Sequence, residues 1–216
     1  MAELDAANLH SPEFWDERYS AHEPVWSGKV NQRLVEQTGH LTPGAALDIG
    51  CGEGGDAVWL ARQGWTVTAV DVSAVVIEKA RTQAATVLPA EVAARITWQP
   101  ADMRSWQPPA GFDLVSLQFV HLTVPLLTEA QARWAAAVVP GGTLLIVNHD
   151  PLDLQTTLHR PNIPGVMLAA DEIVATLDPA LWHVEVAEPF PRPFTDPEGR
   201  SITIHDTVVR AVRRAG

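Results

Sequence analysis

Apolar positions along the chain follow two alternating patterns. Short runs of consecutive apolar and β-branched residues have the length and composition of buried strands. Between these runs, apolar residues recur at the three- and four-residue spacing of one helix face. Strands that alternate with helices in this way predict a Rossmann-like, doubly wound α/β fold, with a mostly parallel sheet and helices on both faces. The predicted strands lie at 45–49, 66–70, 95–99, 112–117 and 143–147.

Residues that typically begin or end helices lie between these strands. Ser73 is a candidate N-cap for the helix after the second strand. The Thr-Glu-Ala-Gln segment at 128–131 has the form of a capping box and predicts the start of a later helix. Pro140-Gly141-Gly142 is predicted to end that helix before the fifth strand begins.

The C-terminal part of the chain predicts a different arrangement. A helical segment is expected at 171–177, followed by strands at 182–187 and 201–212. The loop between these two strands contains the turn sequence 196–199, Asp-Pro-Glu-Gly. We therefore expect a closing antiparallel pair at the end of a single domain that spans residues 1–216.

Composition and charge exclude several classes of function. With 216 residues, 46% of them hydrophobic, the chain is long enough to bury one substantial core. No apolar run approaches the roughly 20 residues that span a bilayer, and one cysteine among 216 residues does not indicate a metal site. The first residues lack the pattern of a secretory signal, so we expect a cytoplasmic protein. The net charge of −11 makes nucleic acid an unfavourable partner.

A glycine loop after the first strand carries the strongest chemical signal. Gly50, Gly52 and Gly55 satisfy the G-x-G-x-x-G spacing, and an acid, Asp71, ends the next strand. This pattern fits a dinucleotide or S-adenosylmethionine. A dinucleotide brings an anionic pyrophosphate, whereas S-adenosylmethionine brings a sulfonium cation. Asp48 before the loop and Glu53 within it therefore favour the cationic cofactor.

Further residues near strand ends are candidate contacts for that cofactor. Asp71 is placed to accept hydrogen bonds from the ribose hydroxyls. Asp102, after the third strand, could accept from the adenine amine while Met103 packs on the ring. Cys51 lies between two glycines and is interpreted as a small space-filling residue of the loop. The complete set of candidate cofactor contacts is Trp26, Asp48, Gly50, Cys51, Gly52, Glu53, Asp71, Val72, Asp102, Met103 and Phe119.

The ordered motifs resemble those of class I S-adenosylmethionine-dependent methyltransferases. They cover about half of the chain, and the resemblance implies a seven-stranded sheet whose last strand is antiparallel. It also implies methyl transfer to an acceptor. The motifs are Leu47-Asp48-Ile49-Gly50-Cys51-Gly52-Glu53-Gly54, Val70-Asp71-Val72-Ser73, Ala101-Asp102-Met103, Phe112-Asp113-Leu114-Val115 and Pro140-Gly141-Gly142-Thr143.

The N-terminal segment resembles the tellurite-resistance and thiopurine methyltransferase branch. The resemblance rests on the segment 14–19, Phe-Trp-Asp-Glu-Arg-Tyr, and on Trp26-Ser27-Gly28 with Asn31. It implies that residues 1–40 form a helical lid over the cofactor and that the acceptor is small and soft. Tyr19 and Trp26 are then candidate lid contacts. The alternative is that they only anchor an N-terminal helix to the sheet.

Two histidines are candidate catalytic bases at the crevice edge. His121 follows the fourth strand, and His149, with Asp150 beside it, follows the fifth. His205 lies in the closing strand and is interpreted as structural. The segment 117–120, Leu-Gln-Phe-Val, differs from the Asn-Pro-Pro-Tyr element of the amino-methylating nucleic-acid enzymes that resemble this fold.

These observations predict an enzyme that transfers a methyl group from S-adenosylmethionine to a small molecule. In-line displacement needs chiefly the alignment of acceptor, methyl and sulfur, and a base helps where the acceptor is a hydroxyl. Two alternatives stay open. One is an NAD-dependent oxidoreductase, which Asp48 and Glu53 disfavour; the other is a non-catalytic module that binds the cofactor. We expect no membrane partner and no metal.

Overall fold

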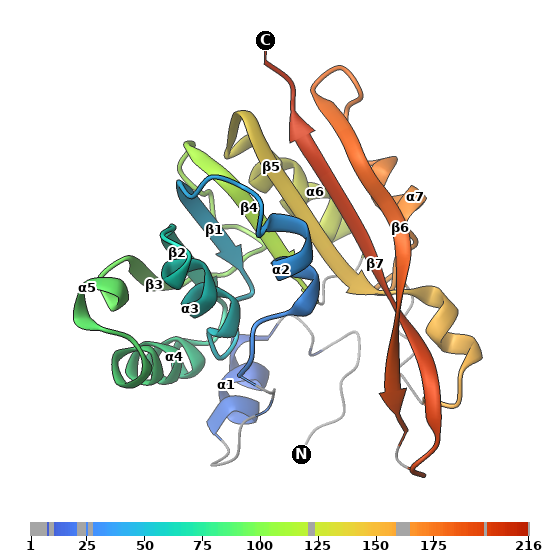
Figure 1. The fold of residues 1–216 in the computed structure, drawn as a ribbon, viewed down its shortest axis with the longest axis horizontal. Coiled ribbons are helices and arrows are strands. Elements are labelled where there is room, and N and C mark those ends of the chain that lie inside the picture. Colours follow the sequence, from blue (N-terminus) through green and yellow to red (C-terminus); the bar gives the residue numbers. More distant parts are fainter. Residues whose placement is uncertain are drawn as a thin grey trace.

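The computed structural model describes residues 8, 11–20, 25, 28–120, 124–158, 165–196 and 198–215. In this part of the chain, seven strands form one sheet in the order β3-β2-β1-β4-β5-β7-β6 (Figure 1). The strands are β1 (Ala45–Ile49), β2 (Thr66–Asp71), β3 (Ile96–Pro100), β4 (Phe112–Gln118), β5 (Val138–His149), β6 (Trp182–Thr195) and β7 (Ser201–Arg213).

Five strands run parallel, and the last two close the sheet in the opposite sense. β1 pairs in parallel with both β2 and β4, so the strand order reverses on either side of β1. β7 is antiparallel to β5 and to β6. The predicted seven-stranded sheet with an antiparallel end is therefore confirmed. In such sheets, ligands bind beyond the carboxyl ends of the strands at the point of reversal, which here lies between β1 and β4.

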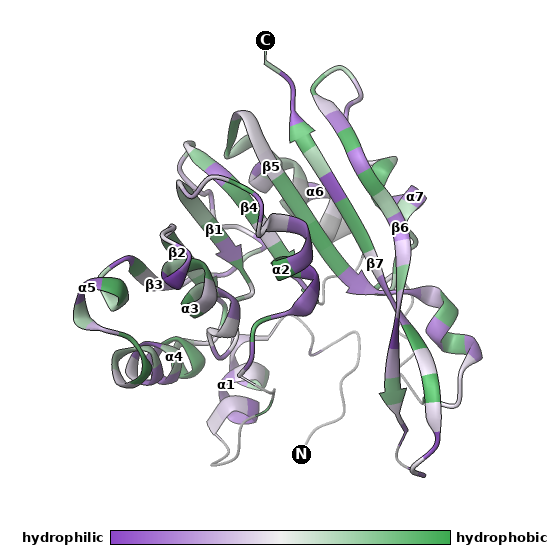
Figure 2. Cartoon of the chain, viewed as in Figure 1, coloured by the Kyte–Doolittle hydropathy of each residue, from purple (hydrophilic) through white to green (hydrophobic). Residues whose placement is uncertain are grey.

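Two separate cores cover the two faces of the sheet. One core joins α2, α3 and α4 to side chains such as Ala46 and Leu145, and the other joins α6 and α7 to side chains such as Leu47 and Leu144. Adjacent residues enter opposite cores because strand side chains alternate between faces. Figure 2 shows the hydrophobic colouring of β5 at the centre of this packing. The helices are α1 (Pro12–Ser20), α2 (Gln32–Thr38), α3 (Gly55–Arg62), α4 (Ala74–Val87), α5 (Ala90–Ala93), α6 (Val124–Ala136), the 3₁₀ helix η1 (Pro151–Gln155) and α7 (Ala170–Val174).

The predicted cap of α4 is confirmed. The Ser73 hydroxyl accepts a hydrogen bond from the Val76 backbone N–H at 3.1 Å. This bond satisfies one of the helix's first four amides, which have no partner within the helix. The cap fixes the direction of the chain as it leaves the tip of β2, where Asp71 lies.

The predicted ends of α6 were wrong. The helix begins at Val124 rather than at the capping box of 128–131, and Pro125 lies in its first turn, where the missing N–H is tolerated. It ends at Ala136. Residues 140–142, which were expected to stop it, instead belong to the first part of β5, at a break in the register between β4 and β5. Gly141, at φ 82°, supplies the backbone conformation that this irregularity requires.

The closing hairpin is longer than its hydrophobic pattern predicted. β6 continues to Thr195, eight residues past the predicted end at 187, and pairs with β7 throughout. The extension contains Pro189, Pro191 and Pro193, which are typical of loops. They are accommodated because β6 is the edge strand, where a missing N–H costs no ladder hydrogen bond. The predicted turn is present, since the Gly199 N–H donates to the Asp196 carbonyl at 2.9 Å.

No helix in the described ranges is long and apolar enough to span a membrane. The same ranges contain no cluster of three or more histidine, cysteine and acidic side chains arranged to hold a metal ion.

Candidate active site

A cavity of about 710 Å³ opens at the carboxyl ends of the central strands. Asp48 of β1, Asp71 of β2, Gln118 of β4 and His149 of β5 all line it. The opposite wall comes from the β6–β7 hairpin, which contributes Arg192 and other side chains. We call the side formed by β1, β2 and the glycine loop the donor half, and the side formed by β5, β6 and β7 the acceptor half.

The glycine loop turns tightly at the floor of the donor half. The Gly50 and Cys51 N–H groups both donate to the Val70 carbonyl, at 2.9 and 3.0 Å. Gly50 has a φ of 70°, and a Cβ there would lie 2.9 Å from a methyl of Val120. A Cβ at Gly55 would lie 2.6 Å from the Lys29 carbonyl oxygen. Glycine is therefore required at both positions. The loop brings its backbone to the cavity together with the Cys51 and Glu53 side chains.

Asp71 is held rigidly at the tip of β2. Its two carboxylate oxygens accept hydrogen bonds from the Gly52 and Ser73 N–H groups, each at 3.0 Å. Burial raises the pKa of Asp71 to about 6, although these backbone donors act in the opposite direction. A buried carboxylate that already accepts two bonds keeps further lone pairs for a ligand hydroxyl. The ribose contact of Asp71 stays a prediction.

Asp48 lies deeper in the donor half. Its Oδ2 atom is buried and has no hydrogen-bond partner among the described residues. Burial raises the pKa of Asp48 well above its usual value, and the negative charges of Asp56 and Asp71 raise it further. An orphaned buried oxygen is costly unless a ligand satisfies it. Asp48 therefore marks a position where a donor or a cation would be stabilised.

Asp56, which sequence reasoning missed, forms a group of three carboxylates with Asp48 and Asp71. It lies in the first turn of α3 and lines the cavity, and its Oδ1 accepts from the Asn31 N–H at 2.6 Å. Burial raises its pKa to about 6. An acid in the first turn after a glycine loop is favoured by the helix dipole, and that position was the available signal.

Other predicted contacts line the donor half as expected. Glu53, Val72 and Met103 face the cavity, and Glu53 Oε1 accepts from the Val25 N–H at 2.9 Å. Cys51 also lines it. Burial raises the pKa of the Cys51 thiol well above its usual value, which fits a space-filling role rather than a nucleophilic one.

Asp102, a candidate cofactor contact near a strand end, does not join Asp48 and Asp71 in the cavity lining. Its side chain pairs with Arg104 at 2.7 Å, is partly exposed, and is not part of the cavity lining. Arg104 lies two residues further along the same turn, where its guanidinium can pair with the Asp102 carboxylate outside the cavity. The adenine contact of Asp102 stays a prediction, while Met103 beside it does line the cavity.

Helix α1 packs over the donor half. Tyr19 is buried, lines the cavity and stacks with Trp15 at 5.7 Å between ring centroids. Asp16 Oδ1 accepts from the Ser73 hydroxyl at 2.5 Å and fixes α1 against the start of α4. Tyr19 is thus anchored by its packing and also lines the cavity. The lid function of residues 1–40 stays a prediction, and Trp26 lies outside the described residues.

Phe119 and His149 form the boundary between the two halves. Their rings lie 4.4 Å apart between centroids. Phe119 has a φ of 53°, a conformation that non-glycine residues rarely adopt, and its N–H donates to the Val147 carbonyl at 2.8 Å. Such strain is commonly retained at functional sites. Of the two candidate bases, His149 lines the cavity, whereas His121 lies outside the described residues.

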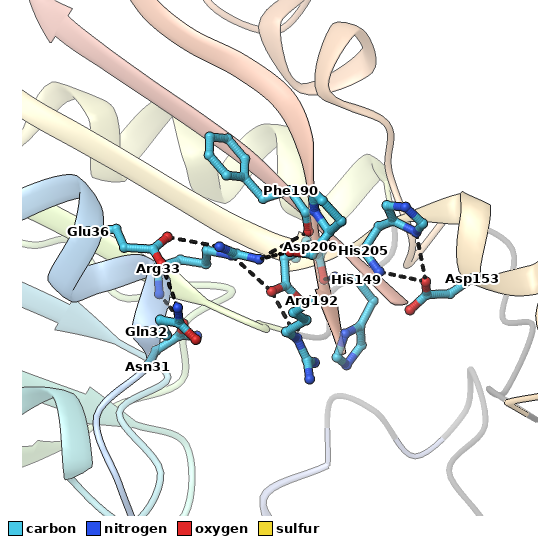
Figure 3. Close-up of polar contacts among 12 residues, drawn as sticks. Asn31, Gln32, Arg33, Glu36, His149, Asp153, Phe190, Arg192, His205 and Asp206 are labelled. Carbon is cyan, nitrogen blue, oxygen red and sulfur yellow. Dashed lines mark hydrogen bonds and ion pairs between the residues drawn. The ribbon is translucent and has the colours of Figure 1, made fainter. Parts of the chain in front are cut away.

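An ion-pair network that sequence reasoning missed supports the acceptor half (Figure 3). The Asp206 carboxylate accepts from Arg33 Nε at 3.2 Å and from Arg192 Nε at 3.0 Å. The two Arg33 terminal nitrogens reach Glu36 and the carbonyls of Phe190 and Pro191. Both side chains of the Arg33–Asp206 pair are buried. His205, interpreted as structural, contacts Asp153 behind this network, away from the cavity lining.

Comparisons with known proteins agree with this architecture. Residues 46–142 match a family model described as a methyltransferase domain. An uncharacterized methyltransferase from Mycobacterium tuberculosis is 35% identical over 124 residues, which cover 56% of this chain and 59% of the relative. A trans-aconitate 2-methyltransferase from Azoarcus sp. is 27% identical over 152 residues, which cover 68% of this chain and 56% of the relative.

The family match and the fold support a class I S-adenosylmethionine-dependent methyltransferase. The chain spans less than two thirds of the length of these curated relatives. Two solved structures share the fold of this chain. TehB from Haemophilus influenzae has a TM-score of 0.67 at 18% identity, covering 94% of this chain and 67% of that one. The glycopeptide N-methyltransferase MtfA, solved with S-adenosylmethionine, has a TM-score of 0.65 at 20% identity, covering 89% and 98%. At these identities, placement in the tellurite-resistance and thiopurine branch stays a prediction.

Proposed function

We propose that this methyltransferase domain binds S-adenosylmethionine in the donor half and methylates a small molecule held in the acceptor half. The single observation that carries the proposal is the group of three carboxylates, Asp48, Asp56 and Asp71, around the glycine loop in one cavity. An anionic pyrophosphate would be repelled there, because charge interactions are strong in a partly buried site. A cationic methionine end would be attracted.

The donor-half residues fit the parts of this cofactor. Asp71 is suited to the ribose hydroxyls, and Met103 and Val72 provide apolar surface for the adenine ring. The glycine loop permits close approach of the methionine end, and the orphaned Asp48 Oδ2 provides an acceptor for its ammonium group. When bound, S-adenosylmethionine supplies a methyl group whose bond to sulfur breaks as an acceptor lone pair attacks the carbon, leaving a neutral thioether.

The remaining residues would align the acceptor and exclude water. Tyr19 and Trp15 cover one side, and Phe119 and His149 separate the donor half from the acceptor half. Such alignment is the main catalytic contribution available for a displacement with a good leaving group. Where the acceptor atom carries a proton, His149 is the described residue in position to accept it. An acceptor that is already ionised needs no base.

The alternatives predict different ligands. An NAD-dependent oxidoreductase would prefer NAD, and a non-catalytic module would bind S-adenosylmethionine without turnover. The cytoplasmic location and the exclusion of nucleic acid as a partner rest on the sequence alone and stay predictions.

Calorimetric titration of the full chain with S-adenosylmethionine, S-adenosylhomocysteine and NAD tests the proposal. We expect both adenosyl ligands to bind and NAD not to bind. Formation of S-adenosylhomocysteine is then followed with a panel of thiols, phenols, amines, carboxylic acids including trans-aconitate, and selenium and tellurium oxyanions. A preference for NAD would refute the proposal, and adenosyl binding with no transfer to any acceptor would favour the binding module.

A further inference from the structure

The extension of the β6–β7 hairpin presents a patterned face to the acceptor half. Along β6, Phe190, Arg192 and Phe194 are partly buried, while the residues between them are exposed. Side chains two residues apart share one face of a strand, so an arginine lies between two phenylalanines on the inner face. Arg192 and Phe194 line the cavity. The prolines that obscured this strand in the sequence occupy the outer face.

Arg192 is fixed at one edge of its guanidinium and remains available at the other. Its Nε donates to both oxygens of Asp206, at 3.1 and 3.0 Å. Its two terminal nitrogens make no hydrogen bond with the residues that the structure describes, and the side chain is 30% exposed. In Figure 3 the end of Arg192 points in the same direction as the His149 ring, and both side chains line the cavity.

Asp206 acts as a rigid support for Arg192. The Asp206 side chain is only 3% exposed and is held from the opposite side by Arg33. Arg33 is itself bound by the Phe190 and Pro191 carbonyls and lies over the Phe190 ring at 5.2 Å. Arg33 pairs with both Glu36 and Asp206, so the two arginines and the two acids balance in charge. Within this network, Arg192 is the arginine that lines the cavity. A planar fork with free donors matches a carboxylate.

Charge is therefore separated within one cavity. The donor half carries the three carboxylates of Asp48, Asp56 and Asp71, and the acceptor half carries the guanidinium of Arg192 beside its partner Asp206. Phe119, Phe194 and Leu158 provide apolar surface in the same cavity. A ligand with an apolar body and an anionic group would be attracted to the acceptor half and repelled from the donor half.

We propose that the methyl acceptor is a small organic acid with an apolar or aromatic body, and that Arg192 binds its carboxylate. Arg192 anchors this carboxylate, and the methyl group goes to a different atom of the same molecule, nearer Phe119 and His149. Arg192 is thus a specificity-determining residue. The inference rests on the proposed function for its reaction, but the binding of the acid is measurable without turnover.

Matched pairs of acids and amides test the proposal directly. Benzoate and benzamide, phenylacetate and phenylacetamide, and trans-cinnamate and trans-cinnamamide are titrated into the full chain by calorimetry, with and without saturating S-adenosylhomocysteine. We expect at least one acid to bind at least about tenfold more tightly than its amide, because a charge-assisted bidentate contact is lost in the amide. Acids that bind no better than their amides, or do not bind at all, would overturn the proposal.

Variants of Arg192 assign the contact. Arg192→Met should weaken acid binding at least about tenfold and leave amide binding within about twofold, while Arg192→Lys should restore part of the difference. Arg200→Met, in the same hairpin but outside the cavity lining, is the control and should change neither. S-adenosylmethionine affinity should stay within about threefold in all three variants. Acid binding that survives in Arg192→Met would overturn the assignment. If the parent chain did not bind S-adenosylmethionine, the proposed function would be refuted instead.

Discussion

The two halves of the cavity differ in how their residues are arranged along the chain. The donor half is built mainly from one continuous region, in which a strand, a glycine loop and the next strand place Asp48, Gly50 and Asp71 within about 25 residues of each other. The acceptor half combines residues from distant strands. His149 lies opposite Asp206 across β5 and β7, and Phe190 lies opposite Asp206 across β6 and β7. Local spacing determines the first half, whereas strand register determines the second.

The difference in charge follows the same division. Burial raises the pKa values of Asp48, Asp56 and Asp71, and the charges of Asp56 and Asp71 raise that of Asp48 further. A bound cation would relieve this unfavourable charge. In the acceptor half, the buried Asp206 already has Arg33 and Arg192 as partners, and the terminal nitrogens of Arg192 make no hydrogen bond with the described residues. The donor half should therefore gain stability on binding, and the acceptor half should contribute stability beforehand.

The largest expected effect is on folding, from the acceptor half. Asp206→Ala would leave the buried Arg33 without its buried charge partner, and we expect the free energy of unfolding to fall by about 3 kcal/mol. Denaturant titration measures this. As a control, Arg81→Ala removes a pair in which both side chains are 62% exposed and should change stability by less than about 0.5 kcal/mol. A loss below about 1 kcal/mol for Asp206→Ala would mean that the network does not support the hairpin.

The second-largest expected effect is on cofactor binding in the donor half. Asp71→Ala should weaken S-adenosylmethionine binding by about 10- to 150-fold, because a charged hydrogen-bond acceptor for the ribose is lost. The binding of an acid probe to the acceptor half should stay within about threefold. Calorimetry on the same preparation measures both. An equal loss of affinity for both ligands would show that the two halves do not bind their ligands independently.

The pH dependence of binding should also distinguish the halves. The pKa values of Asp56 and Asp71 are raised to about 6, so their contribution to folding stability is present below about 4 and is lost as the pH rises through about 6. A bound cation favours the ionised carboxylates, so S-adenosylmethionine affinity should rise by about 10- to 100-fold between about pH 5 and pH 7. Titrations across this range measure the change. A flat or falling affinity would contradict the cationic role of the donor half.

The smallest effect is expected at the rim of the donor half. Glu53→Gln keeps the oxygen that accepts from the Val25 N–H but removes a partly exposed charge. Affinity for S-adenosylmethionine should therefore fall by only about two- to fivefold. A competition assay with a fluorescent adenosyl analogue would resolve this change, which should disappear at high salt. A loss above about 30-fold would instead make Glu53 a direct ligand.

The sequence predicted the parts that depend on short-range patterns. The strand–loop–strand unit around Gly50, the Ser73 cap and the antiparallel end of the sheet follow from apolar periodicity and local spacing. Arg192 could not be predicted as a cavity residue, because three prolines disguised its strand and only the edge position of that strand accommodates them. Asp102 has the right spacing, yet the ion pair with Arg104 draws it from the cavity.

The cation-binding role of the donor half is tested most directly by the affinity of Asp48→Asn for S-adenosylmethionine, measured by calorimetry at neutral pH together with the free energy of unfolding of the variant. Asparagine keeps the size of the side chain but cannot carry the buried negative charge. We expect about 10- to 100-fold weaker binding in a variant whose stability is equal to or greater than that of the parent, because an uncompensated buried acid is removed. Unchanged affinity in a stable variant would contradict the claim that the donor half holds a cation.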